Sequence, residues 1–457
     1  MTLATAAKAM NGRFTGIDRL FTSVSTDSRN LSADALYVAL RGERFDGHDF
    51  IEPAIDGGAV GVVVDSEPDM DLPAIVVDDT LIALQQLAQN WRSRFHGPLI
   101  AVTGSNGKTT VKEMLGSILS LAAPTLLSSG NQNNHIGVPL SLLKLRDDHQ
   151  YAVIEMGMNH AGELAVLTRL AAPTVALINN AAAAHLEGLG SIDQVARAKA
   201  EIFEGLDDDG IAVVNADDAY ADYWKELNAH RKVITFGFGS DADVCAQADI
   251  EVEHSLMRIK SRDSELVFTL LMAGRHNAAN ALAAATVALA LDIPLDVIKA
   301  GLESFSPVAG RSEVVQLKNG DRLINDSYNA NPASMQAAIE MLARFSGRRI
   351  MVMGDMAELG PDSNQLHADI GDYARSLAID EMMAIGPASR HAIDAFGASG
   401  RYFDRIDQLS EALLESLSAN KDSFAGMTTV LIKGSRSMGM ERVSQSLMER
   451  LANGGVN

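Results

Sequence analysis

Short apolar runs that end in polar or glycine residues recur along the whole chain. In the first segment, β-branched runs at residues 36–40, 60–64 and 74–77 predict buried strands. Apolar positions spaced three and four apart predict an amphipathic helix at 81–95. The first segment, residues 1–96, is therefore expected to form a small α/β domain.

The middle segment, residues 97–308, repeats the pattern of an apolar strand followed by a polar loop. Runs at 152–154, 174–178 and 211–214 end at Glu155, Asn179 and Asn215 respectively. Apolar strands that alternate with helical patterns indicate a parallel sheet, and ligands gather at the carboxyl ends of such strands. These polar side chains are therefore expected at one edge of the sheet.

The last segment, residues 309–457, has its own pattern of strand, glycine turn and helix. The runs at 349–355, 382–386 and 429–434 each contain or end in glycine. This arrangement is typical of a dinucleotide-binding fold, but no G-x-G-x-x-G fingerprint occurs at any of the turns. A Rossmann-like domain is predicted, and a nicotinamide cofactor is not indicated.

The most informative stretch is a strand, loop and helix at residues 98–119. Its loop reads Gly104-Ser105-Asn106-Gly107-Lys108-Thr109-Thr110. Such a loop directs backbone N–H groups and the positive end of a helix at one point, where a lysine can reach the outer phosphates of a nucleotide and a hydroxyl can ligate magnesium. The strict P-loop pattern would require glycine at Val102, and the alternative is a tight turn with a solvent-facing lysine. We predict binding of a nucleoside triphosphate.

Taken together, these patterns predict an α/β fold of three domains. They are a small N-terminal α/β domain (1–96), a central P-loop-type ATPase domain with a parallel sheet (97–308) and a C-terminal Rossmann-like domain (309–457). Joints are expected before the phosphate loop and at residues 306–310. A polar turn at 326–332 faces the second joint and is a candidate closing surface.

Two side chains of the middle segment are candidates for metal binding, and a lysine follows them in the chain. Glu155 can hold a magnesium ion that bridges nucleotide phosphates, although a lone glutamate at a strand end can instead cap a helix. His185 is a candidate second ligand, but an isolated histidine is more often structural. Lys199 lies on an amphipathic stretch and, taken by itself, is most simply a surface lysine.

Two further polar positions have both a functional and a structural interpretation. The asparagine-rich loop at 131–137 precedes an apolar helix, and loops carry sites disproportionately, yet asparagines also form simple turns. Asn280 begins an alanine-rich helix and is equally plausible as a packing residue or as an amide that recognises a base.

The net charge of the chain limits the kinds of molecule that it is expected to bind. The chain has 38 Lys and Arg against 59 Asp and Glu, a formal net charge of -21, which disfavours binding to nucleic acid or to an anionic membrane surface. An anionic substrate must therefore meet local positive groups. Arg29 and Arg41 in the first segment are candidates, although their polar stretches are more often solvated loops.

Cysteine content and hydropathy indicate the compartment. The single cysteine, Cys245, excludes an intramolecular disulfide and fits a reducing environment. Residues 1–14 contain no apolar core behind a basic start, so no signal peptide is expected. The most apolar helix, at 281–291, is too short to cross a bilayer. We expect a cytoplasmic enzyme.

Several motifs, in their order along the chain, resemble those of the Mur ligase family of ATP-dependent peptidoglycan-precursor ligases. They are Thr103 to Thr110, Glu155-Met156-Gly157, Gly274 to Asn280, Gly310-Arg311 and Asp326 to Pro332. The likeness covers nearly the whole chain. The family's own loop has the shorter form seen here, so the departure at Val102 favours the resemblance.

Further motifs resemble particular members of the family. Residues 26–29 resemble the uridine-recognising domain of its later members, and the Asp-Asn-Pro-Arg motif of the ligase that reads diaminopimelate is not found. Residues 326–332 and 354–360 resemble the member that adds D-alanyl-D-alanine. The resemblance implies that ATP phosphorylates the terminal carboxylate of UDP-N-acetylmuramoyl-tripeptide, and that the amine of the dipeptide then displaces phosphate from the acyl phosphate.

The resemblance also implies a role for individual residues. Lys108 would hold the outer phosphates, Thr109 and Glu155 one Mg²⁺ ion, and His185 a second. Lys199 matches the position that the family carbamylates to make an extra metal-binding carboxylate. Asn280 would face adenine, Arg311 the γ-phosphate and Asp326 the ribose. The implied contacts to the precursor and dipeptide are Ser28, Arg29, Asn133, Asn134 and Asn329.

Two other activities and a structural or scaffold role remain open at this stage. A folate-type polyglutamate ligase has a similar ATP core, but the extra first domain disfavours it. A nucleotide-switch binding protein would hydrolyse ATP slowly to change partners. For the ligase, Arg311 and Asp326 lie beyond the second joint, so the nucleotide is expected between the last two domains, with closure about residues 307–310 required for turnover. A monomer is expected.

Overall fold

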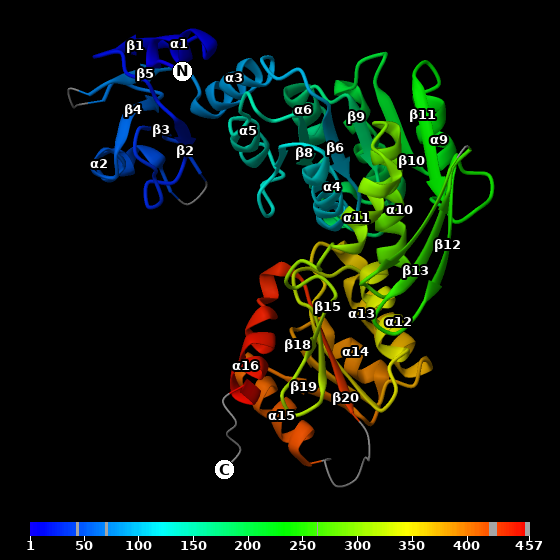
Figure 1. Ribbon diagram of the computed structural model, residues 1–457. Coiled ribbons are helices and arrows are strands. Elements are labelled where there is room, and N and C mark those ends of the chain that lie inside the picture. Colours follow the sequence, from blue (N-terminus) through cyan, green and yellow to red (C-terminus); the bar gives the residue numbers. More distant parts are fainter. Residues whose placement is uncertain (43–44, 69–71, 263, 420–426, 453–457) are drawn as a thin grey trace.

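The chain forms three sheets, each built from a different part of the sequence (Figure 1). The computed structural model describes residues 1–42, 45–68, 72–262, 264–419 and 427–452. The predicted three-domain α/β architecture is confirmed. Within the described residues, no helix has the length and apolar content that a bilayer span requires.

The N-terminal domain has a five-stranded sheet in the order β1-β5-β4-β3-β2, parallel except for β1. Its strands are β1 (Arg13–Thr15), β2 (Ser23–Ser25), β3 (Ala35–Val38), β4 (Ala59–Val64) and β5 (Ala74–Val76). Its helices are α1 (Leu3–Ala9), η1 (Gly47–Phe50), α2 (Ile51–Asp56) and α3 (Thr80–Arg92). Strands β3 and β4 are almost wholly buried, as expected for parallel strands that are covered on both faces.

Helix α3 connects the first two domains (Figure 1). Asp79 caps it by accepting hydrogen bonds from the amides of Leu81 and Ile82 at 2.8 and 2.9 Å. Leu84 and Leu87 pack in the N-terminal core, whereas Ala88 packs in a central core. One helix therefore holds the N-terminal domain against the central one.

The central domain has a nine-stranded sheet in the order β14-β13-β12-β11-β10-β9-β6-β8-β7. Its strands are β6 (Leu99–Thr103), β7 (Thr125–Leu127), β8 (Tyr151–Glu155), β9 (Val175–Ile178), β10 (Ile211–Asn215), β11 (Lys232–Gly237), β12 (Val244–Ile250), β13 (Ser255–Lys260) and β14 (Glu265–Leu270). Its helices are α4 (Lys108–Ala122), α5 (Gly137–Leu142), α6 (Glu163–Ala171), α7 (Leu186–Leu189), α8 (Ile192–Ala200), η2 (Glu201–Gly205), α9 (Ala221–Leu227), α10 (Arg275–Ala290) and α11 (Leu295–Glu303).

Successive residues of the central strand β6 face two separate cores. Ile100 and Val102 pack on the face covered by α4, α10 and α11, while Leu99 and Ala101 pack on the face covered by α5, α6 and α8. This three-layer arrangement follows from a parallel sheet whose crossover helices cover both faces. It buries the strands and leaves their carboxyl ends, where the loops begin, for a site.

The antiparallel strands β12 to β14 were not predicted from the sequence. Strand β13 alternates buried and exposed residues along its length, and it pairs antiparallel with both neighbours. An alternation with a period of two is the signal of a half-exposed strand. The sequence therefore contained the signal, and these strands extend the parallel sheet at one edge.

The C-terminal domain has a six-stranded sheet in the order β15-β16-β20-β17-β18-β19, parallel except for β15. Its strands are β15 (Glu313–Gln316), β16 (Arg322–Asp326), β17 (Arg348–Gly354), β18 (Glu381–Ile385), β19 (Gly400–Phe403) and β20 (Thr428–Lys433). Its helices are α12 (Pro332–Ala343), η3 (Gly360–Asp362), α13 (Ser363–Ser376), α14 (Ser389–Phe396), α15 (Ile406–Ala419), η4 (Arg436–Met438) and α16 (Glu441–Ala452).

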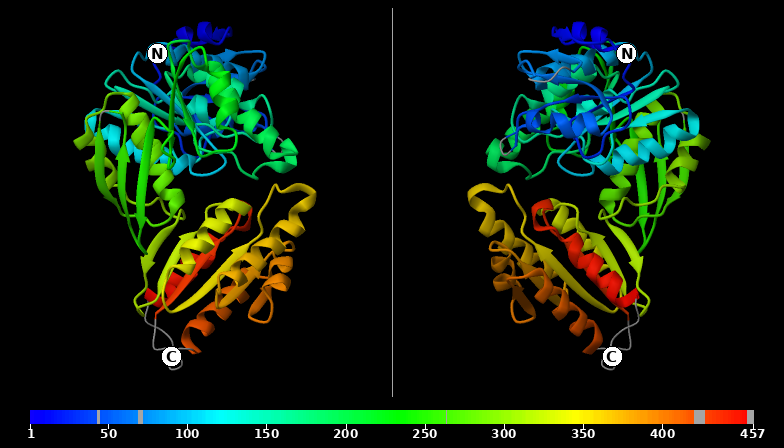
Figure 2. Two further views of the ribbon diagram at one scale, coloured as in Figure 1. Left: turned by 90° about the vertical axis from the view of Figure 1, so that its right-hand side faces the viewer. Right: turned by 90° about the vertical axis from the view of Figure 1, so that its left-hand side faces the viewer.

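The C-terminal domain lies beneath the central domain in all three views (Figures 1 and 2). Its strands β16, β17 and β20 are parallel neighbours, so the loops after them emerge at one edge of the sheet. Residues from all three of these loops line a cleft together with the carboxyl edge of the central sheet. The two carboxyl edges therefore face each other.

Candidate active site

A cleft of about 840 Å³ lies between the central and C-terminal domains. Its central wall contains the loop after β6, the end of β8, the loop after β9 and the start of α10. Its other wall contains the turn between β16 and α12, the loop after β17 and the turn after β20. The structure thus brings together the strand ends that the sequence analysis singled out in both domains.

The loop after β6 has the geometry of an anion site. Gly107 has φ +79°, and a Cβ added there would lie 2.2 Å from the side-chain oxygen of Asn280, so only glycine fits. The first intrahelical bond of α4 runs from the amide of Val111 to the carbonyl of Gly107. The amides of the first turn therefore precede the helical hydrogen bonds and lie at the positive end of the helix dipole.

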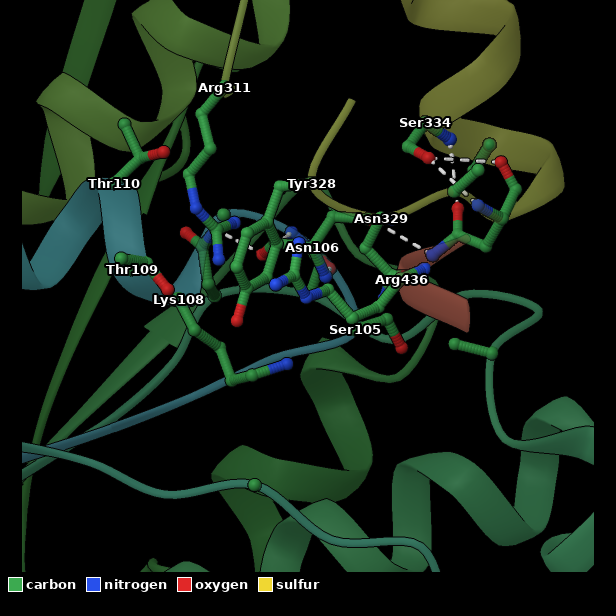
Figure 3. Close-up of a pocket in the computed structure, with 18 of the residues that line it drawn as sticks. Ser105, Asn106, Lys108, Thr109, Thr110, Arg311, Tyr328, Asn329, Ser334 and Arg436 are labelled. Atoms are coloured by element: carbon green, nitrogen blue, oxygen red, sulfur yellow. Dashed lines mark hydrogen bonds between the residues drawn. The ribbon is translucent and has the colours of Figure 1, made fainter. Parts of the chain in front are cut away.

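Lys108 is the first residue of α4, and its side chain turns back over the loop. Its Nζ donates to the carbonyl oxygen of Gly104 at 2.7 Å. Burial lowers the pKa of Lys108, Glu155 opposes this shift, and Arg311 adds to it. Figure 3 shows Lys108 and Thr109 beside Arg311, which comes from the C-terminal domain. The alternative of a solvent-facing lysine does not fit this position.

The Glu155 carboxylate is buried and bound by neutral groups. It is 2% exposed, and it accepts from the Thr109 hydroxyl at 2.7 Å and from the Asn133 side-chain amide at 2.8 Å. The Ser128 hydroxyl accepts from the backbone amide of Glu155 at 3.0 Å, which fixes the strand end. A buried carboxylate beside a hydroxyl group offers the hard oxygen donors that magnesium prefers.

These donors fit a magnesium ion that takes most of its ligands from a nucleotide and water. Among the described residues, no group of three or more His, Cys, Asp and Glu side chains is arranged to hold a metal by itself. Magnesium is usually bound by one or two carboxylates together with substrate phosphates and water. Thr109 and Glu155 therefore fit one ion, provided that phosphate oxygens complete its shell.

His185 contacts the C-terminal domain. Its Nδ1 lies 2.6 Å from Oε2 of Glu358, and the carbonyl of Glu358 accepts from the amide of Glu187 at 3.1 Å. The hydrogen bond from His185 lowers the pKa of Glu358, although burial opposes this shift. His185 lines the cleft, and its predicted role as a ligand of a second metal stays a prediction.

Lys199 is not a surface lysine, so that interpretation is wrong. It lies on α8 and is 1% exposed. Burial lowers its pKa well below the ordinary value, and neighbouring Lys108 adds to the shift while Asp218 opposes it. Its amine is thus near Lys108, although Lys199 is outside the set of described residues that line the cleft. Burial favours the neutral amine.

The C-terminal wall of the cleft contains cationic side chains that were not among the residues implied by the family resemblance. Lys433 is 3% exposed, and its Nζ donates to Asp326 Oδ2 at 2.5 Å and to the carbonyl of Asn329 at 2.9 Å. The amide of Ser312 donates to Asp326 Oδ1 at 2.9 Å. Sequence analysis missed Lys433 as a site residue, although it ends an apolar strand, which is the signal that identified Glu155.

Tyr328 contacts two arginine side chains of the same wall. The guanidinium of Arg311 lies 4.0 Å from the centre of the Tyr328 ring, and that of Arg436 lies 5.6 Å from it (Figure 3). Both distances are within the range of cation–π interactions. The ring therefore keeps two positive groups at the cleft, where an acidic protein needs them to hold a polyphosphate.

Asparagine side chains connect the phosphate loop to its surroundings. The Asn179 amide donates to the carbonyl of Asn106 at 2.9 Å and to Oδ1 of Asn280 at 2.8 Å. The Asn215 amide donates to the carbonyl of Asn179 at 2.9 Å. Asn280 is 5% exposed and lines the cleft. It therefore packs among its neighbours, and its role in recognising a base stays a prediction.

The predicted contacts to a precursor fall in two places. Ser28 and Arg29 belong to the N-terminal domain and are outside the described lining of the cleft, whereas Asn133, Asn134 and Asn329 line it. Asn134 Oδ1 accepts from the amide of Gly137, the first residue of α5, at 2.8 Å. The structure does not bring the two groups together, and one ligand could contact both only if it were extended.

The candidate arginines of the N-terminal domain are paired with their own neighbours. Arg29 Nη2 lies 2.8 Å from Asp27, and this ion pair holds the pKa of Asp27 at about 2. Arg41 Nε lies 2.6 Å from Asp65, and Arg41 also contacts Asp46. A phosphate group would have to compete with these carboxylates.

Models of one protein family match most of the chain. The model of the Mur ligase middle domain matches residues 102–288, that of the Mur ligase, glutamate ligase domain matches 310–436, and that of the Mur ligase family, catalytic domain matches 20–92. The chain is 42% identical over 452 residues to UDP-N-acetylmuramoyl-tripeptide--D-alanyl-D-alanine ligase of Escherichia coli (strain K12), with 98% of each chain covered.

Two solved structures extend the comparison to three dimensions. Crystal structure I of MurF from Acinetobacter baumannii has a TM-score of 0.92 and 36% identity, with 98% of each chain covered. The structure of MurF ligase from Thermotoga maritima in complex with ADP has a TM-score of 0.82 and 28% identity, covering 95% of this chain and 98% of that one.

Proposed function

The chain belongs to the Mur ligase family, and on this premise we propose that it joins D-alanyl-D-alanine to UDP-N-acetylmuramoyl-tripeptide, with ATP converted to ADP and phosphate. Its similarity to relatives that carry this name extends over almost the full length of both chains. The single observation in the structure that carries the proposal is the buried Glu155 carboxylate beside Thr109 and the phosphate loop, facing Arg311 and Lys433 across the cleft.

The first chemical step activates a carboxylate. An oxygen of the terminal carboxylate of the tripeptide attacks the γ-phosphorus of ATP, the bond from that phosphorus to the ADP oxygen breaks, and an acyl phosphate forms. Phosphoryl transfer depends mainly on positioning and on neutralising charge. Lys108 and Arg311 supply positive groups for the phosphates, and the amides at the start of α4 supply hydrogen-bond donors.

The second step forms the amide bond. The free amine of the dipeptide attacks the carbonyl carbon of the acyl phosphate, which gives a tetrahedral intermediate. Collapse of the intermediate breaks the bond from carbon to the phosphate oxygen, so that inorganic phosphate leaves, and the amine nitrogen loses its proton. Cations at the cleft stabilise negative charge on the carbonyl oxygen and on the leaving phosphate.

We propose that Thr109 and Glu155 hold Mg²⁺ and that His185 contributes to a second ion. When bound, magnesium neutralises phosphate charge and orients the reacting groups. The hydrogen bond between Thr109 and Glu155 supports a shared site, since both oxygen atoms already point to one place. For His185 the support is its position on the cleft.

We propose that Lys199 is carbamylated, as the resemblance implies. Its amine is buried and its lowered pKa favours the neutral form, and only a neutral amine can attack carbon dioxide. ¹³C NMR of the protein at neutral pH in ¹³C-labelled bicarbonate, with Lys199→Met as the control, would detect the carbamate carbon. A spectrum without that signal under conditions of full activity would contradict the assignment.

The remaining site roles are also proposals. We assign Asn280 to adenine and Asp326 to ribose, because both border the cleft near the phosphate loop. Asn133, Asn134 and Asn329 would contact the peptide end of the precursor or the dipeptide, and Ser28 and Arg29 the uridine end. An extended precursor that runs from the N-terminal domain to the cleft would satisfy both sets.

We propose domain boundaries at residues 96/97 and 308/309. The first lies between α3, which ends at Arg92, and β6, which begins at Leu99. The second lies between α11, which ends at Glu303, and β15, which begins at Glu313. Limited proteolysis followed by mass spectrometry would test whether cleavage concentrates in these two connections.

The function is tested by following phosphate release with ATP, magnesium, the tripeptide precursor and D-alanyl-D-alanine, and omitting each component in turn. We expect release to require all four. Equal release without any amine acceptor would support the nucleotide-switch alternative. Release that requires glutamate and a folate instead would support the polyglutamate-ligase alternative.

We further propose that the protein works in the cytoplasm as a monomer. A single cysteine and the need for ATP support a reducing, nucleotide-rich compartment. Sedimentation at concentrations used for assay would test the oligomeric state, since a dimer would sediment as a particle of twice the chain mass.

A further inference from the structure

The contact between Asn331 and Asn106 joins the two walls of the cleft. Asn331 Nδ2 donates to Asn106 Oδ1 at 2.7 Å, across 225 positions of sequence. Asn106 belongs to the phosphate loop, and Asn331 precedes α12 of the C-terminal domain. A hydrogen bond therefore runs from the C-terminal domain to the loop that is predicted to hold the nucleotide.

The backbone of Asn106 is already fixed by the central domain. Its amide donates to Asn180 Oδ1 at 2.8 Å, and its carbonyl accepts from the side chains of Asn179 at 2.9 Å and Asn180 at 3.1 Å. The amide of Asn106 is consequently engaged by protein and does not contribute to an anion site in this arrangement. What Asn106 presents to the other domain is its side-chain oxygen.

Both halves of the Asn331 side chain are also used. Its Oδ1 accepts from the amide of Ser334 at 2.9 Å, and the Ser334 hydroxyl accepts from the amide of Asn331 at 3.0 Å, which makes a capping box at the start of α12. Pro332 follows and fixes the first turn. This cap determines the orientation of the amide: the oxygen faces the helix and the NH₂ group faces Asn106.

The chemistry of this position is specific to asparagine. Aspartate can cap a helix equally well but has no hydrogen to donate to Asn106. Serine can cap the helix but is too short to reach across the cleft. Asn331 therefore both caps α12 and donates a hydrogen bond to Asn106. Only the cap is needed to stabilise α12.

We propose that Asn331 is a positioning residue for ATP, which fixes the phosphate loop through Asn106 when the C-terminal domain closes. Closure and the nucleotide-binding shape of the loop then form together, because the same amide group caps α12 and holds the loop. This inference rests on the proposed function, since it concerns the same ATP site. A residue that only capped α12 would affect stability and leave ATP binding unchanged.

The test separates these two roles with matched variants of the full-length protein. Asn331→Ser keeps a cap and loses the contact to Asn106, and Asn331→Asp keeps the cap and puts a charged carboxylate against the Asn106 side chain. Ser334→Ala weakens the capping box and leaves the contact to Asn106. For each variant we would measure the thermal midpoint, kcat, KM for ATP, and the dissociation constant of a non-hydrolysable ATP analogue.

We expect Asn331→Ser to raise the dissociation constant for the analogue about three- to tenfold, the range for loss of one neutral hydrogen bond. Asn331→Asp is expected to raise it further, because the carboxylate adds a negative charge near the phosphates. Ser334→Ala is expected to lower the thermal midpoint with no change in nucleotide affinity. Small-angle scattering with the analogue should report less closure for Asn331→Ser than for wild type.

A double-mutant cycle with Asn106→Ala tests whether Asn331 acts on ATP binding through Asn106. We expect Asn331→Ser to have no further effect on analogue affinity in the Asn106→Ala background, because its partner is gone. Multiplying effects of the two substitutions, or a lower thermal midpoint with wild-type affinity in Asn331→Ser, would overturn the proposal. The binding of the ATP analogue is measured without the dipeptide, so it does not depend on the proposed ligase reaction. If that reaction were wrong, phosphate release would be the same with and without the dipeptide.

Discussion

The cleft and the N-terminal domain differ in how their candidate residues are held before any ligand binds. In the cleft, Glu155 and Lys433 are buried and bound to groups whose own positions are fixed. In the N-terminal domain, Arg29 is exposed and paired with Asp27 two residues away. The cleft is therefore preorganised for charge, which is what phosphoryl transfer requires, whereas the arginine must exchange one partner for another.

This difference predicts the size of mutational effects. A group that is held in place and acts on the reacting phosphate should affect kcat strongly, whereas an exposed group that binds a remote part of the substrate should affect KM weakly. Four substitutions, taken from the largest expected effect to the smallest, test that ordering.

The largest effect is expected at Lys108. We expect Lys108→Ala to reduce turnover by about a thousandfold or more, since loss of a preorganised charge at a transferring phosphate is costly. The fold should be retained, because among the described residues the one hydrogen bond of the amine goes to the carbonyl of Gly104. Steady-state kinetics and circular dichroism would measure both. Turnover within tenfold of wild type would contradict the assigned role.

A somewhat smaller loss is expected at Glu155. We expect Glu155→Gln to reduce kcat about a hundredfold and to raise the magnesium concentration needed for half-maximal rate, because a neutral amide is a poor ligand for a hard cation. The measurement is a magnesium titration of phosphate release. A full rate at the wild-type magnesium midpoint would show that the carboxylate has no metal role.

Lys112 provides a lysine one helical turn beyond Lys108 with a different expected effect. Its side chain is fully buried, and its Nζ donates to the carbonyl of Ser128 at 2.8 Å. We expect Lys112→Met to destabilise the protein by about 1–3 kcal/mol, the range for a buried acceptor left without its donor. Urea unfolding would measure it. Turnover per folded molecule should fall far less than in Lys108→Ala, and an equal fall would remove the contrast between the two lysines.

The smallest effect is expected at Arg29. We expect Arg29→Ala to raise KM for the precursor only a few-fold, with kcat and the thermal midpoint unchanged, since exposed ion pairs contribute little to stability. A large fall in kcat would contradict the contrast between the two regions.

The same substitution has a signature in the titration of Asp27. Arg29 holds the pKa of Asp27 at about 2, below its usual value of 3.8. A lowered folded-state pKa stabilises the protein above the unfolded value, and that contribution disappears as the pH falls from near 4 towards 2. In Arg29→Ala the pKa should rise towards 3.8, which NMR titration would detect. At neutral pH this contribution is present in the wild type and absent from Arg29→Ala, but the pair is exposed and screened by solvent, so it is too small to move the thermal midpoint measurably; below about pH 2 the difference disappears.

Much of the fold was predictable because its strands are buried on both faces. Continuous apolar runs identified β4, β9 and β17, and the strand-end rule identified Glu155. The exposed antiparallel strands β12 to β14 were missed, because a period-two pattern of mixed residues is weaker than an apolar run. Lys433 was missed, although the same strand-end rule would have identified it.

The contacts between domains could not be predicted from the sequence. The bond between Asn106 and Asn331 and the bond between His185 and Glu358 each join residues more than one hundred positions apart. Neither residue of a pair has a local pattern that indicates its partner, since both depend on how two independently folded sheets face each other. The buried state of Lys199 likewise depends on packing from beyond its own helix.

The central claim is that the cleft activates a carboxylate as an acyl phosphate before the amine attacks. The direct measurement uses precursor whose terminal carboxylate is labelled with ¹⁸O, incubated with ATP, magnesium and D-alanyl-D-alanine, followed by mass analysis of the inorganic phosphate. The account predicts that one labelled oxygen per turnover appears in the phosphate. Phosphate without label, released while the amide product forms, would contradict it.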